Sequence, residues 1–446
     1  MTKKALVLGT GLVSRPCVES LVQTGFMLTC VSAIQEELDN LLKAFPSLST
    51  VRLDVSKDKE ALQKLIRESN IVISLLPQFL HHAIALICID EKKNLITTSY
   101  LDYAMRSLHE SAVAAGITVL NEAGLDPGLD HMIAMKSVDA LKQVNGQISE
   151  LRSLCGGIPA EEWNAGPIKY KFSWYPKGVF LSALQPSRCL LDEKIVDYET
   201  IYEHAETFTG HFEDYKLECL PNRDALIYRD MYDIPTASVL FRGTLRHLGF
   251  SKVLKALATI GLMEQSALPE LESNAPILTW KELIIILLKL PHGRNQETVE
   301  KAVLEKLSND QEQLKILTDL ELISNKTVPK KSTPLDSLCA HLVHFLAYEP
   351  GEQDLVLMLV KVSAQLASGQ QCIHETTLIE KGTPIGGHSA MSRIVGLTAA
   401  ACADLLASGA VQGRGVILPI TKDIYEPVLA KLLAEGIKIE TTVSEV

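Results

Sequence analysis

Two arginine-containing segments in the middle of the chain carry the residue type that binds carboxylates best. Residues 220–224 read LPNRD and residues 241–246 read FRGTLR, and each segment lies at or just after a strand-like stretch. A guanidinium presents a planar fork of N–H donors that grips a carboxylate through two parallel hydrogen bonds. Several arginines facing one cleft would suit a substrate with more than one carboxylate. Taken singly, each arginine could equally be solvated at a strand end.

Three titratable side chains are candidates for proton transfer, namely Asp126, Cys155 and Tyr100. Each also has an ordinary structural interpretation. Asp126 precedes a proline and could be a turn residue, Cys155 precedes two glycines and could be packed core, and Tyr100 could be strand-end packing. A catalytic role requires one of them within hydrogen-bond reach of the reacting nitrogen.

The first strand and the turn after it predict a nucleotide site. Residues 3–9 read KKALVLG, and Gly9-Thr10-Gly11-Leu12-Val13-Ser14-Arg15-Pro16 leads into a helical pattern. A buried strand, a glycine turn and a helix N-terminus form the phosphate site of a dinucleotide-binding fold. Serine stands at position 14, where the full motif has a third glycine, and it is small enough to keep helix and strand close. The alternative is a purely structural tight turn.

The end of the second predicted strand, residues 27–32, indicates which dinucleotide binds. An NAD-binding fold usually places an acidic residue there to take the ribose 2′-hydroxyl, and this chain has Ser32-Ala33. Nothing at that point repels a 2′-phosphate, so the pattern favours NADP, although no arginine supplies an obvious counter-charge. Ser32 could instead be only a helix N-cap. Asp54, at the end of the third predicted strand, could accept from an adenine amino group or cap the residues after it.

The elements that must position these residues fall into three zones. Six strand–helix alternations in about the first 125 residues predict an α/β fold, a Rossmann-type doubly wound parallel sheet. Short strand-like pieces after residue 148, residues 170–174 and 212–219 among them, predict an inserted α+β domain with a mixed sheet that binds substrate. A helical insert follows, and the last stretch, through residues 437–443, is expected to return to the first domain. The expected domains are residues 1–127 plus about 388–446, about 128–250 plus about 352–387, and about 251–351.

Composition excludes several classes of partner. The net charge of -11 argues against nucleic-acid or anionic-membrane binding, and the longest apolar candidate, residues 283–288, is too short to span a membrane. Nine scattered cysteines fit a reducing cytoplasm, not disulfides or a zinc site. No metal site is expected, since His341 and His344 have no nearby third ligand. The chain starts directly on its first strand, so we expect no targeting peptide.

Six motifs in order resemble a known family. Besides residues 9–16, 220–223 and 241–246, they are residues 121–128 (NEAGLDPG), Cys155-Gly156-Gly157 and residues 171–174 (KFSW). Together they are similar to the saccharopine reductases, the NADP-dependent, L-glutamate-forming saccharopine dehydrogenases of the aminoadipate lysine-biosynthesis pathway. The resemblance covers essentially the whole chain. The absence of a fused lysine-ketoglutarate reductase module suggests the stand-alone biosynthetic type.

The resemblance implies a reversible reductive condensation. Glutamate and 2-aminoadipate 6-semialdehyde form an imine, which NADPH reduces to saccharopine, in a homodimeric enzyme. It implies cofactor and substrate contacts by position. The cofactor contacts are Gly9, Thr10, Gly11, Leu12, Val13, Ser32, Ala33, Ile34, Asp54, Val55, Leu76, Thr98, Ser99, Leu125, Asp126, Pro127, Gly128 and Trp174. The substrate contacts are Ser99, Tyr100, Asp126, Arg223, Thr244, Leu245 and Arg246, with Arg242 less certain.

This chain departs from the family at one position. Many relatives carry an arginine just after the second strand, where this chain has Ser32-Ala33-Ile34.

Two other functions compete with this interpretation. An imine reductase of polyamine metabolism (homospermidine or carboxynorspermidine type) would need acidic residues in place of Arg223 and Arg246, because its substrates are cationic. A non-catalytic dinucleotide sensor would not need the Asp126 loop or the arginines.

Overall fold

The computed structural model describes residues 3–446, and its first sheet is fully parallel. The strands are β1 (Lys4–Leu8), β2 (Met27–Ser32), β3 (Ser49–Arg52), β4 (Ile71–Ser74), β5 (Asn94–Thr97), β6 (Thr118–Leu120) and β15 (Gly415–Ile417), in the order β15-β6-β5-β4-β1-β2-β3. Strand order reverses between β1 and β4, which is where doubly wound sheets bind ligands at the carboxyl ends of their strands. The predicted Rossmann-type sheet is confirmed.

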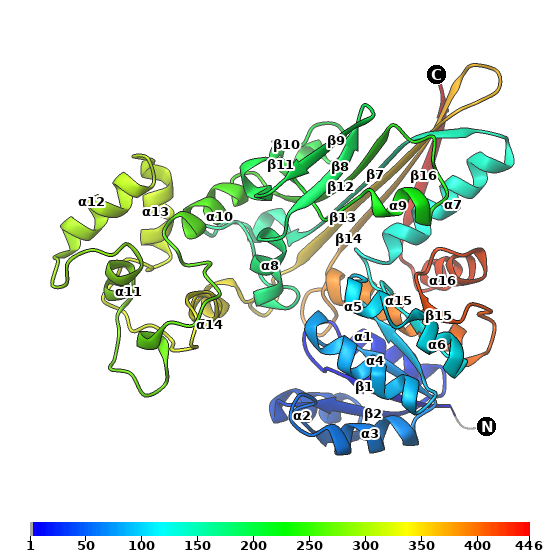
Figure 1. Ribbon diagram of the computed structural model, residues 1–446, viewed down its shortest axis with the longest axis horizontal. Helices are drawn as coiled ribbons and strands as arrows, with labels where there is room; N and C mark the ends of the chain where they lie inside the picture. The colour runs from blue at the N-terminus through cyan, green and yellow to red at the C-terminus, as the bar shows by residue number, and fades with distance from the viewer. Residues whose placement is uncertain (1–2) are drawn as a thin grey trace.

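Helices cover both faces of this sheet, as expected for parallel strands that are apolar on both sides. They are α1 (Arg15–Gln23), α2 (Gln35–Ala44), α3 (Lys59–Glu68), α4 (His81–Asp90), α5 (Tyr103–Arg106) and α6 (His109–Ala115), followed later in the chain by α15 (Ala390–Ala407) and α16 (Lys422–Ala434). In Figure 1 this nucleotide domain is the blue and cyan part at the lower right, with the orange α15 above it.

The second sheet is mixed, as predicted. Its strands are β7 (Gln147–Pro159), β8 (Ser187–Leu191), β9 (Lys194–Tyr198), β10 (Glu206–Thr207), β11 (Leu217–Pro221), β12 (Val239–His247), β13 (Asp354–Gln365), β14 (Gln371–Lys381) and β16 (Ile439–Glu445). Strands β12 and β7 are parallel, and the register pairs Arg242 with Ser153 and Thr244 with Cys155. Because side chains alternate along a strand, Arg242, Thr244 and Arg246 share one face of this sheet.

Two helices, the long α7 (Leu129–Gln143) and the short α9 (Ile227–Met231), belong to this part of the chain. Helix α7 begins directly after the Asp126 loop, and it packs against β7, β13 and α16. It therefore links the loop at the edge of the parallel sheet to the mixed sheet.

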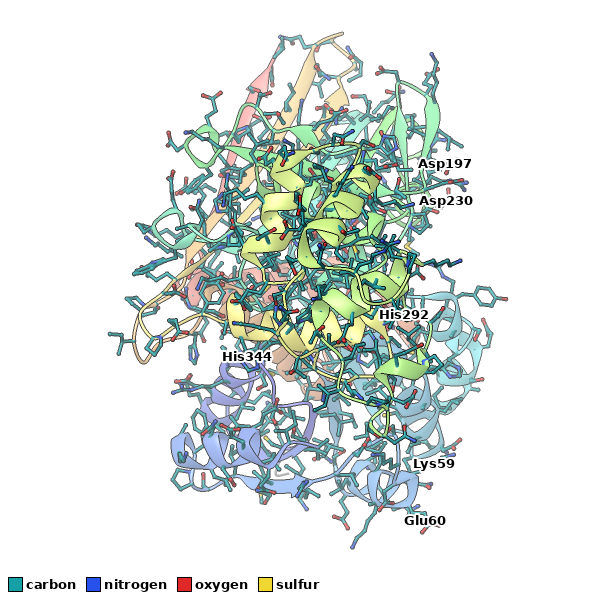
Figure 2. All side chains as sticks on the ribbon, turned by 90° about the vertical axis from the view of Figure 1, so that its left-hand side faces the viewer. Lys59, Glu60, Asp197, Asp230, His292 and His344 are labelled. Atoms are coloured by element: carbon teal, nitrogen blue, oxygen red, sulfur yellow. The ribbon has the colours of Figure 1, made fainter. Side chains whose placement is uncertain are left out.

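A helical part extends from the mixed sheet, away from the nucleotide domain (Figure 1). It contains α8 (Pro176–Ala183), α10 (Phe250–Thr259), α11 (Trp280–Leu287), α12 (Gln296–Lys306), α13 (Gln311–Asp319) and α14 (Pro334–Leu346), packed around Trp280 and the leucines near it. His341 is buried there, accepting from the Trp280 indole N–H at 3.2 Å. Figure 2 looks onto this part, with His292 and His344 labelled on it.

Helix α15 returns the chain to the nucleotide domain, where it packs against α1. A Cβ at Gly396 would lie 2.7 Å from the Cys17 backbone nitrogen, so the two helices can approach only because this residue is glycine. By length and composition α15 is also long and apolar enough to cross a membrane, a possibility the sequence interpretation missed. In the structure 67% of that span is buried, and its neighbours are α1, α16, β13, β5 and β4, as in a core helix.

Three local expectations were wrong. Residues 170–174 form no strand, because their aromatic side chains pack into the core of the helical part and Phe172 N–H bonds the carbonyl of Leu346 at 2.7 Å. Strand β11 starts only at Leu217, since Phe212 and Lys216 have φ of 67° and 46°, outside the β region. The last strand, β16, pairs with β14 of the mixed sheet and not with the nucleotide domain.

Candidate active site

The turn after β1 has the geometry of a phosphate cradle. Gly9 has a φ of 92°, and a Cβ there would lie 3.1 Å from the Leu75 carbonyl carbon and 3.1 Å from the Leu76 side chain. Within residues 3–446 the N–H groups of Gly11, Leu12 and Val13 donate no internal hydrogen bond. These donors sit at the N-terminus of α1, where the helix dipole also favours an anion. The turn therefore fits the pyrophosphate of a dinucleotide.

The end of β2 carries a carboxylate that the sequence did not reveal. Glu37, in the first turn of α2, accepts hydrogen bonds from the hydroxyls of Ser32 at 2.6 Å and Thr10 at 3.0 Å. Ser32 is thus not the N-cap residue of α2; that position is Ile34, whose N–H bonds the Ser32 hydroxyl at 3.1 Å. The side chains of Ala33 and Ile34 are exposed beside it.

The other expected cofactor residues follow strand ends of the parallel sheet, except Trp174, which belongs to the inserted part. Asp54 accepts hydrogen bonds from the backbone N–H and the hydroxyl of Ser56, so it caps the turn that follows it, while Asp58 is the N-cap of α3. Thr98 packs 3.2 Å from a Cβ built at Gly124, so the strand end after β5 touches the loop that contains Leu125, Asp126, Pro127 and Gly128. Trp174 bonds the Tyr170 hydroxyl at 3.1 Å in the inserted part. Val55 is half-buried, like Thr98 and Ser99.

A buried ionic cluster forms where the Asp126 loop meets the mixed sheet. Arg242 on β12 pairs with Asp126 and, at 2.7 Å, with Asp130 on α7. The guanidinium lies between the rings of Tyr100 and Tyr228, at 5.6 and 4.9 Å from their centroids. Tyr100 donates its hydroxyl to Asp126 at 2.8 Å. The structure therefore brings Tyr100 and Asp126 together, and it adds Arg242 as their shared partner.

The pKa values of the two carboxylates in this cluster shift in opposite directions, because their charged and hydrogen-bonding neighbours differ. Burial raises the pKa of Asp126 above its usual range, while Arg242 acts in the opposite direction. Asp130 meets a similar burial penalty, but Arg242, His131 and the backbone N–H groups together outweigh it and lower its pKa. Two adjacent carboxylates whose pKa values move apart are typical of acid–base sites, with one holding a proton that the other lacks.

The two other titratable candidates keep their protons. Burial, followed by the charge of Asp126, raises the pKa of Tyr100 and of Cys155 well above the usual ranges of a phenol and a thiol. Cys155 lies on β7 beside Thr244, and it is 5% exposed. Neither group would serve as a base near neutral pH, and Cys155 is best placed as a packed thiol at the edge of the site.

A second buried layer supports the cluster, and sequence reasoning missed it. His131 on α7 bridges the carboxylate of Glu122 and the hydroxyl of Tyr232. Glu122 also accepts from Leu101 N–H at 2.7 Å and from Tyr228 at 3.3 Å, and it has a φ of 57°. One signal was present: Asp130 and His131 interrupt an otherwise apolar helix start (LDHMIAM) that is buried throughout.

Arg246 and Arg223, by contrast, have no acidic partner within the described residues 3–446. Arg246 is 6% exposed, stacks on the rings of Tyr170 and Phe250, and donates from one terminal nitrogen to the carbonyl of Leu245 at 2.8 Å. Within the described part of the chain its buried Nε has no hydrogen-bond partner, which is also true of Arg242 Nε. Arg223 stacks on the Tyr100 ring at 4.8 Å, and its Nε is likewise unpartnered. Buried cationic N–H groups without acceptors are costly unless a ligand supplies them.

The remaining expected substrate contacts divide between two faces. Thr244 is half-buried between Arg242 and Arg246 on the same face of β12. The side chain of Leu245 points to the other face and packs among Leu154, Leu217 and Leu357, so only its backbone could reach a substrate. Asn222, not expected from sequence, donates to the Tyr100 hydroxyl at 3.2 Å.

Comparisons with known proteins agree with this architecture. Residues 5–120 match the family described as saccharopine dehydrogenase NADP binding domain, and residues 124–437 match the saccharopine dehydrogenase C-terminal domain. The chain is 31% identical to the Schizosaccharomyces pombe saccharopine dehydrogenase [NADP(+), L-glutamate-forming] over 98% of each chain. The apo saccharopine dehydrogenase (L-Glu forming) of Saccharomyces cerevisiae superposes with a TM-score of 0.84 at 31% identity, covering 99% of this chain and 100% of that one.

Longer proteins are also similar. The mitochondrial alpha-aminoadipic semialdehyde synthase of Bos taurus is 39% identical over 98% of this chain, but the match covers only 48% of that protein. The chain thus spans about half the length of such relatives. With both family domains matched in order over most of its length, the chain belongs to the saccharopine dehydrogenase family and begins with that family's NADP-binding domain.

Proposed function

We propose that the protein is an NADP-dependent saccharopine dehydrogenase of the L-glutamate-forming type. The observation that carries this proposal is that Arg223 and Arg246, near the Asp126–Arg242 cluster, have no acidic partner within residues 3–446. Saccharopine has three carboxylates and a secondary amine. Two free cations for carboxylates and a carboxyl group for the amine match that pattern.

The names of the relatives support the same chemistry. The S. pombe and S. cerevisiae proteins are saccharopine dehydrogenases described as NADP(+)-dependent and L-glutamate-forming. In that direction saccharopine, water and NADP give glutamate, 2-aminoadipate 6-semialdehyde, NADPH and a proton. When bound, NADP accepts the hydride from the carbon beside the secondary amine.

The protein's own residues would bind, orient and exchange protons. Arg246 and Arg223 would hold two substrate carboxylates, and Thr244 between them would add a hydroxyl. Arg242 cannot also take a carboxylate, because Asp126 and Asp130 already occupy it. Its role would be to hold Asp126 in place and to balance the charge of the two aspartates.

Asp126 is the group we propose for proton transfer. Its pKa is raised by burial, so it holds a proton more readily than an ordinary carboxyl group and could exchange that proton with the substrate nitrogen or with an attacking water. Tyr100, bonded to the same carboxylate oxygen, would orient Asp126 while keeping its own proton. Closure of the mixed sheet over the cofactor edge would exclude bulk water during hydride transfer.

A spectrophotometric assay tests the proposal. The purified protein is mixed with saccharopine and NADP, and absorbance of the reduced cofactor is followed, with NAD in a parallel cuvette. We expect turnover with saccharopine and none when it is replaced by a polyamine such as homospermidine. No reduction of either cofactor by saccharopine would overturn the proposal.

Two further parts of the proposal concern the setting of the enzyme. A homodimer is implied by the family resemblance, and light scattering on the purified protein would measure it. A cytoplasmic location is supported by the nine cysteines, all of which are free and buried. Imaging a tagged copy of the protein in its cell of origin would test the location.

A further inference from the structure

Glu37 occupies the position from which a dinucleotide-binding fold reads the adenosine ribose. Its carboxylate accepts hydrogen bonds from Ser32 at the end of β2 and from Thr10 in the glycine turn after β1. One of its oxygens also lies 3.8 Å from a Cβ built at Gly11. The end of β2 beside the glycine turn is where such folds recognise the 2′ position of the ribose.

The two hydroxyls are committed to this carboxylate. Ser32 and Thr10 each have a single proton to donate, and in the structure both point to Glu37. A 2′-phosphate arriving at the end of β2 would meet an acceptor where it needs donors, and a negative charge close by. A 2′-hydroxyl would instead find an acceptor for its own proton.

The cations near this point only partly offset Glu37. Within residues 3–446 no lysine, arginine or histidine nitrogen lies within salt-bridge distance of its carboxylate. Arg52 on β3 pairs in register with Ser32, and its Nε lies 3.4 Å from the carbonyl oxygen of Ala33. That side chain is exposed at the rim, so it could reach a 2′-phosphate from the solvent side but is screened by water and salt.

We propose that Glu37 is the residue that determines cofactor specificity: it accepts the 2′-hydroxyl of NAD and opposes the 2′-phosphate of NADP, with Arg52 as the counter-charge. The site then binds both dinucleotides. Its preference for NADP is weaker than the lack of an acidic residue at positions 32–34 predicts, because Glu37 supplies a carboxylate at the same place. The proposal rests on the proposed function only in requiring that a dinucleotide binds at the glycine turn.

Direct binding tests this without any turnover. The dissociation constants of NADH and NADPH are measured by cofactor fluorescence for the wild type and for E37Q, E36Q and R52Q, with thermal unfolding to confirm that each variant folds. Glutamine can still accept the bonds from Ser32 and Thr10. Glu36 is the matched control, since it is exposed in the same helical turn and has the same charge.

E37Q should strengthen NADPH binding relative to NADH by about tenfold, from removal of one nearby like charge. E36Q should shift the ratio less than about twofold, and R52Q should weaken NADPH alone, by about fivefold. The proposal would be overturned if E37Q did not raise the affinity for NADPH relative to NADH, or if E36Q raised it by the same factor.

The binding measurements also separate this inference from the proposed function. Wild-type protein that binds neither dinucleotide would overturn the inference together with the cofactor part of that function. Binding of both without oxidation of saccharopine would overturn the enzymatic proposal and leave the role of Glu37 to be decided by the ratio.

Discussion

Arg242 and Arg246 stand two pleats apart on one face of β12, yet they meet opposite electrostatic environments. Arg242 is held by two carboxylates and lies between two tyrosine rings. Arg246, almost as deeply buried, has aromatic rings around it, and within residues 3–446 its only acceptor is the carbonyl of Leu245. The same residue type on the same strand therefore has two environments: carboxylates of the protein neutralise Arg242, whereas Arg246 has no acidic partner within residues 3–446, as our proposal that it binds a substrate carboxylate requires.

The difference arises from the elements that face each arginine. The Asp126 loop and the start of α7 approach β12 at Arg242 and bring Asp126 and Asp130 with them. At Arg246 the facing segment is residues 170–174, which supplies rings instead of acids. We therefore expect a mutation of Arg242 to reduce mainly the stability of the protein, and a mutation of Arg246 to reduce mainly its activity.

The largest effect is expected for R242M. Removing the cation leaves the buried Asp130 carboxylate, whose pKa is lowered, without its main counter-charge and Asp126 without one of its donors, which should lower the free energy of unfolding by about 3–5 kcal/mol. Urea denaturation followed by circular dichroism measures this, with R242K as a control that keeps the charge. A loss below about 1 kcal/mol would mean that the pair does not stabilise the fold.

D126N should leave the fold intact and lower kcat by about a hundredfold or more, because the amide cannot exchange a proton. The pH dependence of unfolding gives a second measure. Because the folded pKa of Asp126 is raised, the folded protein holds a proton that the unfolded chain has lost. Its contribution to the free energy of unfolding is therefore present below the ordinary carboxyl pKa and is lost as pH rises toward the folded value.

The free energy of unfolding of D126N should therefore fall less than that of the wild type as pH rises from the ordinary carboxyl pKa toward neutrality. Identical pH dependences of unfolding in the two proteins would show that Asp126 is ionised in the folded state. A kcat within about tenfold of the wild type would remove its role in proton transfer.

R246M should show the reverse of R242M. Loss of a charge-assisted contact to a substrate carboxylate, about 2–3 kcal/mol, corresponds to a fall in kcat/KM for saccharopine of about 30- to 150-fold. The free energy of unfolding should stay the same or rise, since a buried cation without an acidic partner is removed. NADPH binding should not change. The control is R188M, an exposed arginine paired with Asp197, which should alter neither quantity by much.

Y100F should have the smallest effect. The ring remains beneath Arg223, and only the hydroxyl that donates to Asp126 is lost, at about 1 kcal/mol or about a fivefold fall in kcat. A fall beyond about a hundredfold would instead make Tyr100 the group that transfers the proton. Steady-state kinetics with saturating saccharopine distinguishes the two outcomes.

The nucleotide domain could be predicted closely because its signals are local. Each strand is a short apolar run bounded by turn residues, and Gly9 and Gly11 lie next to the strand they serve. Glu37 was not predicted, since an acidic residue in a first helical turn already has a sufficient explanation in the helix dipole. Its second role depends on Thr10, which is far away in the sequence and adjacent only after β1 and β2 pair.

For the proposed substrate site, the sequence predicted which residue types are present better than it predicted which of them contact each other. Asp126, Arg223 and Arg246 stood out as polar residues in turn-rich or strand-end motifs. Asp130 and His131 did not, because their partners come close only in the folded chain: Arg242 on β12, Tyr232 just after α9, and Glu122 in the loop before α7. Residues 170–174 were assigned to a strand because alternating aromatics fit either a sheet or the core of a helical part.

Because β16 pairs with β14, the molecule should stay assembled after a single cut in the chain before β15. The chain enters the mixed sheet after β6, returns to the parallel sheet with α15 and β15, and ends back in the mixed sheet. A protease that cuts the exposed turn at residues 408–410 would produce a C-terminal fragment that remains hydrogen-bonded to β6 through β15 and to β14 through β16. The two fragments should therefore elute together in gel filtration and separate only in denaturant.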